Sequence, residues 1–92
     1  MNISSRDAEK ALRIKSAVTE FFNTSSLTKV PAKDLMSLFI QKGIFTSNHR
    51  DGLPIRNFLR HLAENDSLSL IPQVHFEQKA QNRNWYFIKI TR

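Results

Sequence analysis

The chain has 92 residues and no cysteine, and its 14 lysine and arginine residues against eight acidic ones give a formal net charge of +6. This length fits a single domain, residues 1–92, whose one modest core leaves little room for a deep substrate cleft. The absence of cysteine excludes disulfide bonds and thiolate metal sites, and no apolar run approaches the ~20 residues of a membrane span, so we expect a cytoplasmic protein without membrane contacts.

The first predicted element is a helix over about residues 5–23. Ser4 or Ser5 can cap it, and Asp7 and Glu9 in its first turn favour the exposed N–H groups. Apolar residues at helical spacing predict a core-facing stripe, which comprises Leu12, Ile14, Ala17, Val18, Phe21 and Phe22. The other side carries Arg6, Lys10, Arg13 and Lys15. The two acidic residues partly offset this charge, so a solvated face is favoured over a second basic binding surface.

A minimal strand is predicted over residues 27–30, followed by a second helix that Pro31 starts and that runs to about Lys42. The core spacing in this helix is given by Ala32, Leu35, Leu38 and Phe39. Gly43 is a natural C-terminal stop. The segment 44–53 is predicted to turn, since it contains Ser47, Asn48 and Asp51-Gly52.

Residues 49–65 read HRDGLPIRNFLRHLAEN and predict a third helix over residues 54–64, with Pro54 in its first turn. Positions i, i+3, i+4 and i+7 face the core and are Ile55, Phe58, Leu59 and Leu62. The outer face carries Arg56, Asn57, Arg60 and His61. Arginine can bind the edge of guanine and asparagine that of adenine, and both side chains also reach phosphates.

The periodicity then changes from near 3.6 to 2, which predicts a β-hairpin. Its first strand is predicted from Leu68 onwards, and Pro72 indicates an edge strand or a bulge. The shared face of this strand comprises Leu68, Leu70, Val74 and Phe76. A polar turn over residues 79–84 and a second strand over 85–90 follow, and the pattern leaves the hairpin register open. Trp85 and Tyr86 in this strand are interpreted as core residues rather than as a stacking platform for unpaired bases.

The order helix, strand, helix, helix, strand, strand predicts a small α+β domain with three helices, a short first strand and a C-terminal β-hairpin. This order resembles the winged-helix superfamily over residues 8–91. The segment DGLPIRNFLRHL, followed closely by a strand, is also similar to the LOTUS type of winged helix, a class implicated in RNA or protein binding. Residues 1–4 are expected to form a flexible N-terminus.

In winged-helix proteins that bind DNA, the third helix usually enters the major groove and the hairpin wing contacts the backbone or the minor groove. The resemblance therefore implies a reading helix over residues 54–64 and a wing over 78–84. The candidate nucleic-acid-binding residues are Arg50, Arg56, Asn57, Arg60, His61, Lys79, Asn82 and Arg83. His49 and Arg50 could also hold a phosphate near the positive end of the helix. With the basic net charge, these residues favour double-stranded DNA as the partner.

Other interpretations stay open at this point. The outer face of the third helix could contact protein or simply be solvated, and hairpin tips are polar in any case. A protein-interaction or dimerisation module is supported by a surplus of bulky apolar residues, which are Ile40, Ile44, Phe45, Leu53 and Ile71. RNA or single-strand binding is a third alternative.

No sequence pattern typical of catalysis is present. The three histidines, His49, His61 and His75, lack the spacing of a metal pair on one helix. The only two glycines, Gly43 and Gly52, are explained by turns of the chain and form no phosphate loop. We therefore expect a protein that is not an enzyme and has no metal or cofactor, and that acts as a regulator or as an accessory of a larger assembly.

Overall fold

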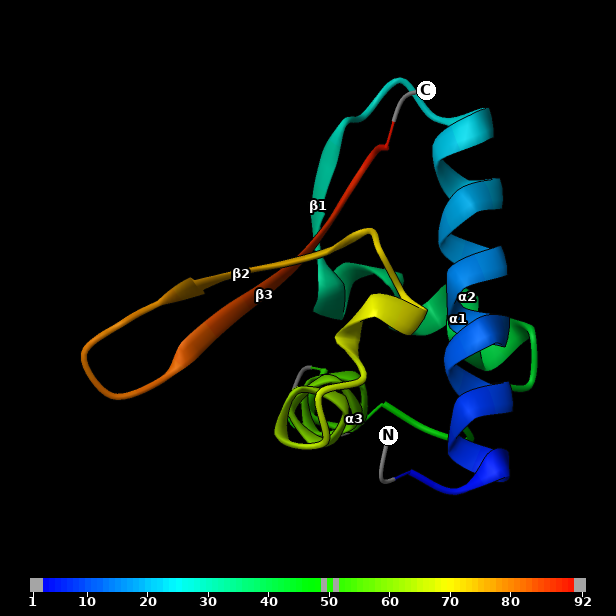
Figure 1. The fold of residues 1–92 in the computed structure, drawn as a ribbon. Coiled ribbons are helices and arrows are strands. Elements are labelled where there is room, and N and C mark those ends of the chain that lie inside the picture. Colours follow the sequence, from blue (N-terminus) through cyan, green and yellow to red (C-terminus); the bar gives the residue numbers. More distant parts are fainter. Residues whose placement is uncertain (1–2, 49, 51, 91–92) are drawn as a thin grey trace.

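Three α-helices and three strands follow one another in the predicted order within the described part of the chain, residues 3–48, 50 and 52–90 (Figure 1). The helices are α1 Ser5–Thr24, α2 Met36–Gln41 and α3 Leu53–Glu64. The strands are β1 Lys29–Pro31, β2 Val74–Gln78 and β3 Arg83–Ile88, and two 3-10 helices are η1 Ala32–Leu35 and η2 Leu68–Leu70. The chain is therefore a small α+β domain. His49, Asp51 and residues 1–2 of the expected flexible N-terminus lie outside the described residues.

The first helix begins with the capping residue that its sequence suggested. The Ser4 hydroxyl accepts a hydrogen bond from the Asp7 backbone N–H at 3.1 Å, so Ser4 rather than Ser5 is the cap. The buried stripe comprises Ala11, Ile14, Ala17, Val18 and Phe22. Leu12 was wrongly expected in this stripe and is 48% exposed. It follows the buried Ala11 by one residue, and this step rotates its side chain by about 100° away from the core.

The expected second helix over residues 31–42 is divided into η1 and α2. Pro31 does not start a helix, because its backbone is extended and it pairs with Tyr86 as the last residue of β1. Gly43 ends α2 as expected, in a left-handed conformation with φ of +75°. The N–H of Ile44 donates to Phe39 O at 2.8 Å and that of Gly43 to Ile40 O at 2.9 Å, which is a Schellman cap.

The sheet has the order β1-β3-β2, and both pairs are antiparallel. The third strand is central because it pairs with β1 from Lys29↔Ile88 to Pro31↔Tyr86, and with β2 from Val74↔Phe87 to Gln78↔Arg83. These pairs define the hairpin register that the sequence left open.

The prediction that the first hairpin strand starts near Leu68 is wrong. Residues 68–70 form η2, and β2 begins only at Val74. Pro72 lies in the turn between them, which the N–H of Val74 closes by donating to Ile71 O at 3.1 Å. The apolar alternation of residues 68–70 thus arises from a 3-10 turn whose leucines pack partly against the core.

The core lies between the three helices and the sheet, with the rings of Phe39 and Phe87 edge to face at 5.9 Å. It uses four of the five apolar residues that looked surplus to a small domain: Ile44 and Ile71 are buried, and Ile40 and Phe45 pack partly buried against it. These four residues therefore form no exposed patch for a partner.

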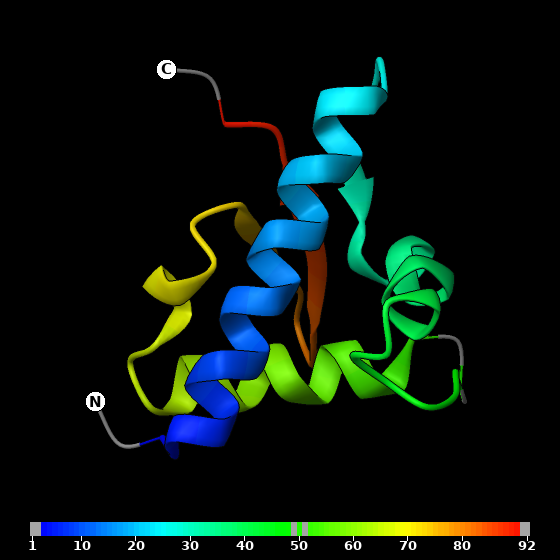
Figure 2. The ribbon, with the colours of Figure 1, turned by 90° about the vertical axis from the view of Figure 1, so that its right-hand side faces the viewer.

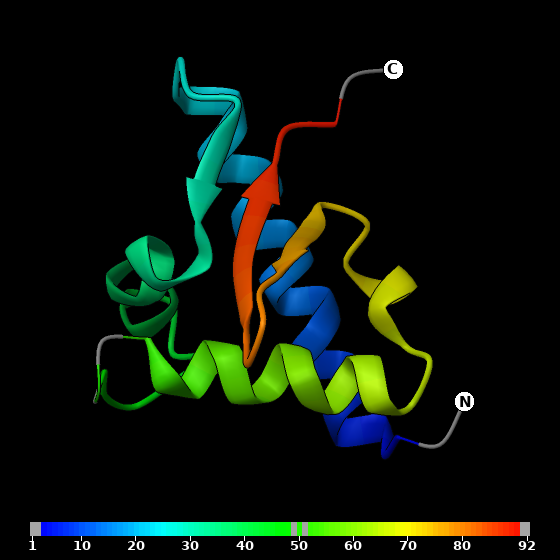
Figure 3. The ribbon, with the colours of Figure 1, turned by 90° about the vertical axis from the view of Figure 1, so that its left-hand side faces the viewer.

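The elements are arranged with the hairpin projecting from one side of the molecule and α1 lying on the other (Figure 1). From the side of α1, this helix passes in front of the sheet and α3 (Figure 2). From the opposite side, α3 runs crosswise beneath the projecting hairpin (Figure 3). This arrangement is compatible with a winged helix. No helix among the described residues is long and apolar enough to cross a membrane.

Candidate nucleic-acid interface

A groove of about 820 Å³ separates α3 from the hairpin. Among its described lining residues, five side chains are cationic and one is acidic, namely Lys33, Arg50, Arg56, Arg60 and Arg83 against Glu64. Side-chain amides come from the hairpin and its tip: Gln78, Gln81, Asn82 and Asn84. Pro31, Trp85 and Tyr86 complete the lining. The groove is therefore a positively charged, amide-rich surface, and its cationic and amide side chains are of types that contact phosphates.

The α3 wall of the groove is a single row of side chains. Arg56, Arg60 and Glu64 follow one another at intervals of four residues, so they lie above one another on one face of the helix. Asn57 is exposed on α3 but does not line the groove. The sequence predicted that all four polar outer residues would act together, whereas the structure brings only the two arginines to the groove.

His61 contacts α1 instead of facing the groove. Its Nε2 lies 3.0 Å from Asp7 Oδ2, and the Asn65 side-chain amide donates to the His61 carbonyl at 2.8 Å. One residue beyond Arg60, the helix has turned by about 100°, which directs His61 towards the first turn of α1. Its place in the fold is a contact between α1 and α3.

Lys10 adds a second contact at this junction. Its ammonium lies 4.2 Å from the ring centroid of Phe45 and 5.3 Å from that of Phe58. Burial between these rings lowers the pKa of Lys10, and the positive charges of Arg13 and Arg6 add to this effect while Asp7 opposes it. Lys10 therefore helps to hold α3 against α1, and it is not part of a free basic surface.

Gly52 determines how the start of α3 meets η1. Its φ is +94°, and a Cβ atom built there would lie 2.4 Å from Lys33 Cβ and 2.9 Å from Lys33 Cα. Only glycine permits this approach, which carries Lys33 to the groove. The Gly52 N–H donates to Asn48 Oδ1 at 2.8 Å, which fixes the turn.

The side chain of Arg56, in α3, also binds the turn that precedes this helix. Its Nη2 donates to Arg50 O at 2.9 Å and its Nε to Gly52 O at 3.4 Å. Arg50 itself is exposed, has a φ of +51° and lines the groove. Arg50, for which the sequence predicts a phosphate contact, therefore lies in the groove, while His49 lies outside the described residues.

Arg83 is held in a defined place on the wing. Its Nε donates to Gln78 Oε1 at 3.0 Å, and its guanidinium carbon lies 4.7 Å from the ring centroid of Phe76 and 5.7 Å from that of Trp85. Trp85 is only 6% exposed, so it packs as a core residue beneath Arg83. This stacking orients the arginine at low entropic cost.

At the tip of the wing, Asn82 lines the groove, but Lys79 is not among the lining residues. The Lys79 N–H closes the turn by donating to Asn82 O at 2.7 Å. On the hairpin, Glu77 pairs with Lys29 at 3.2 Å, and the hydrogen bond from this lysine, with its charge, lowers the pKa of Glu77. The acid at the base of the wing is thus matched by a cation of β1.

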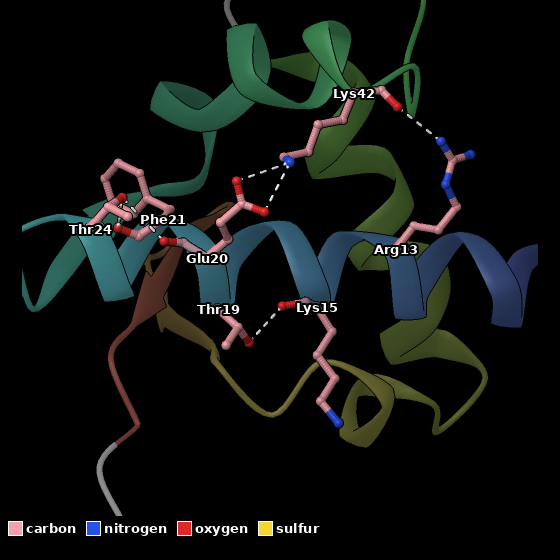
Figure 4. Close-up of polar contacts among 7 residues, drawn as sticks. All are labelled: Arg13, Lys15, Thr19, Glu20, Phe21, Thr24 and Lys42. Atoms are coloured by element: carbon pink, nitrogen blue, oxygen red, sulfur yellow. Dashed lines mark hydrogen bonds and ion pairs between the residues drawn. The ribbon is translucent and has the colours of Figure 1, made fainter.

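On the far side of the molecule, α1 is linked to the loop after α2 (Figure 4). Arg13 Nη2 donates to Lys42 O at 2.9 Å, and Lys42 Nζ lies 3.1 Å from Glu20 Oε2. A hollow of about 340 Å³ lies here, with Leu12 in its lining. Arg13 thus serves a contact within the fold.

Lys33 also lines the groove, although no local sequence pattern predicts it, because it reaches the groove through the close approach of η1 to Gly52, a residue distant in sequence. Comparisons with protein-family models, with curated proteins and with solved structures find no match to the chain.

Proposed function

We propose that this chain is a non-catalytic winged-helix module that binds double-stranded DNA in the groove between α3 and the hairpin. The observation that carries the proposal is the gathering of Lys33, Arg50, Arg56, Arg60 and Arg83 along one groove. Residues 33 and 83 come from elements far apart in sequence, yet they line the same groove as the arginines of α3. A polar helix face that is merely solvated would not need cations from other elements beside it. The helix spans about 18 Å at 1.5 Å per residue, which is enough to lie across a major groove about 12 Å wide.

The roles follow from the positions of the side chains. Arg60 faces the base edges from α3, while Arg50 and Arg83 bind phosphates on either side of it. Asn82 supports the wing contact with its amide, and Lys79 adds a long-range charge at the tip. Asn57 and His61 take no direct part in the groove.

The salt dependence of binding tests this function. Three to five phosphate contacts give a slope of log K against log salt of about −2.7 to −4.5, so affinity should fall about 40- to 500-fold between 50 and 200 mM salt. Exchanging Arg83 or Lys79 for alanine should weaken binding to all sequences alike, Arg83 more strongly. A flat slope, or no binding at low salt, would contradict the proposal.

Binding to RNA or to single strands has less support. Trp85 lies beneath Arg83 and is almost fully buried, so it offers no free ring face to an unpaired base. Competition of a duplex with either of its separated strands distinguishes the two functions, because the proposal requires the duplex to bind more tightly.

A protein-interaction module is favoured by one observation, the half-exposed Leu12 beside the hollow on α1. Sedimentation of the pure protein tests whether this face pairs two copies. A monomer that binds duplex DNA supports the leading proposal.

A further inference from the structure

The two arginines on the α3 wall of the groove differ in how far their hydrogen-bond donors are already used. Arg56 donates to Gly52 O and Arg50 O, so part of its guanidinium fork is occupied within the fold. Arg60 is exposed, lines the groove and makes no side-chain hydrogen bond or ion pair with any described residue. Its whole fork is available to a ligand.

Glu64, one turn further along the same wall, is unexpected in a groove for a polyanion. Among the described lining residues it is the one acid, and it makes no hydrogen bond or ion pair with a described residue. A carboxylate repels phosphates but accepts hydrogen bonds, so it favours a donor group on the ligand. In the major groove, such a donor is the N4 amino group of cytosine.

The spacing of Arg60 and Glu64 suits two base edges. Four residues advance about 6 Å along the helix, which lies between one and two steps of about 3.4 Å in duplex DNA. Arginine forks onto O6 and N7 of guanine, and a glutamate accepts from cytosine. Both side chains therefore favour the same type of base pair.

We infer that Arg60 and Glu64 are specificity-determining residues that give the groove a preference for G·C base pairs over A·T base pairs. The inference rests on the proposed binding of duplex DNA and adds which base edges the groove prefers. Arg56 and Arg83, whose donors are partly used within the fold, contribute affinity that is independent of the base pairs.

The test measures the affinity of the purified 92-residue chain for two duplexes of equal length, one rich in G·C and one rich in A·T, at one fixed salt concentration. The chain should bind the G·C duplex about 5- to 100-fold more tightly. Arg60→Lys keeps the charge but removes the fork, so the ratio should fall to about twofold while the salt slope stays the same. Arg83→Lys is the matched control and should retain the ratio.

A third duplex separates base contacts from DNA shape. Replacing guanine with 7-deazaguanine removes the N7 acceptor and keeps Watson–Crick pairing. With the unmodified chain, this duplex should lose most of its advantage over the A·T duplex. With Arg60→Lys the loss should be at most about twofold, because only that much preference remains. Glu64→Gln should strengthen binding to both duplexes, because it removes a negative charge, and more so for the A·T duplex.

Failure of the base-pair preference can be distinguished from failure of duplex binding itself. Salt-dependent binding with equal affinity for both duplexes, or a preference that Arg60→Lys and 7-deazaguanine leave intact, overturns the inference and leaves duplex binding in place. Absence of salt-dependent binding to every duplex overturns both. Unchanged thermal unfolding of Arg60→Lys, expected at an exposed helix position, shows that the fold is retained.

Discussion

At the scale of single residues, Gly52 lets the turn before α3 pack closely against Lys33, which lines the groove. Its positive φ and its approach to Lys33 both exclude a side chain. Gly52→Ala should lower the free energy of unfolding by about 2 kcal/mol or more, because left-handed strain of about 1–2 kcal/mol adds to an overlap with the Lys33 backbone. Urea denaturation measures the change.

Gly43→Ala is the matched control for this substitution. Gly43 also has a positive φ, but the nearest atom to an added Cβ is Arg13 Nη2 at 3.8 Å, an ordinary contact. We expect a loss of about 1 kcal/mol from backbone strain alone. Equal losses for the two variants would show that the approach to Lys33 does not restrict position 52.

The site could be predicted from the sequence only where it follows a local period. Arg56 and Arg60 share a helix face by spacing alone, and the structure places both in the groove. His61 was misplaced because its partner Asp7 lies 54 residues away, beyond any local pattern. Lys33 was overlooked for the same reason, since it depends on how η1 meets the turn before α3.

At the scale of elements, β3 holds the sheet together because it pairs with both other strands. Phe87, which pairs with both β1 and β2, is fully buried against Phe39, whereas Phe76 on β2 is 38% exposed. Phe87→Ala should lower the free energy of unfolding by about 3–5 kcal/mol, and Phe76→Ala by about 1 kcal/mol. Chemical denaturation of both variants measures the difference, and similar losses would mean that the outer part of the hairpin is as well packed as its base.

The elements differ in how well the sequence predicted them. The α1 and α3 helices match within a residue of their predicted ends, because long periodic apolar stripes specify them, with the Ser4 cap at the start of α1 and Pro54 in the first turn of α3. Two short segments differ from the prediction: residues 68–70 alternate like a strand but form η2, and Pro31 ends a strand instead of starting a helix. Three or four residues carry too little pattern to distinguish a strand from a 3-10 turn, so tertiary contacts decide.

At the scale of the whole molecule, we expect the affinity for DNA to depend more on where the basic residues lie than on the net charge. The basic residues of α1 lie away from the groove, and Lys10 and Arg13 contact other parts of the fold. At 0.15 M salt the Debye length is about 8 Å, so cations outside the groove are largely screened from a bound duplex. Affinity for DNA should therefore follow the groove cations and not the formal charge of +6.

Two double variants of equal net charge test this expectation. Arg60→Gln with Arg83→Gln removes two cations from the groove, and Arg6→Gln with Lys15→Gln removes two from α1. The groove pair should weaken duplex binding at least about tenfold and make the salt slope shallower by about 1–2, whereas the α1 pair should change affinity by less than about twofold. Titrations at several salt concentrations measure both quantities. Equal losses would mean that the chain attracts DNA through its total charge, and the groove would then have no special part in binding.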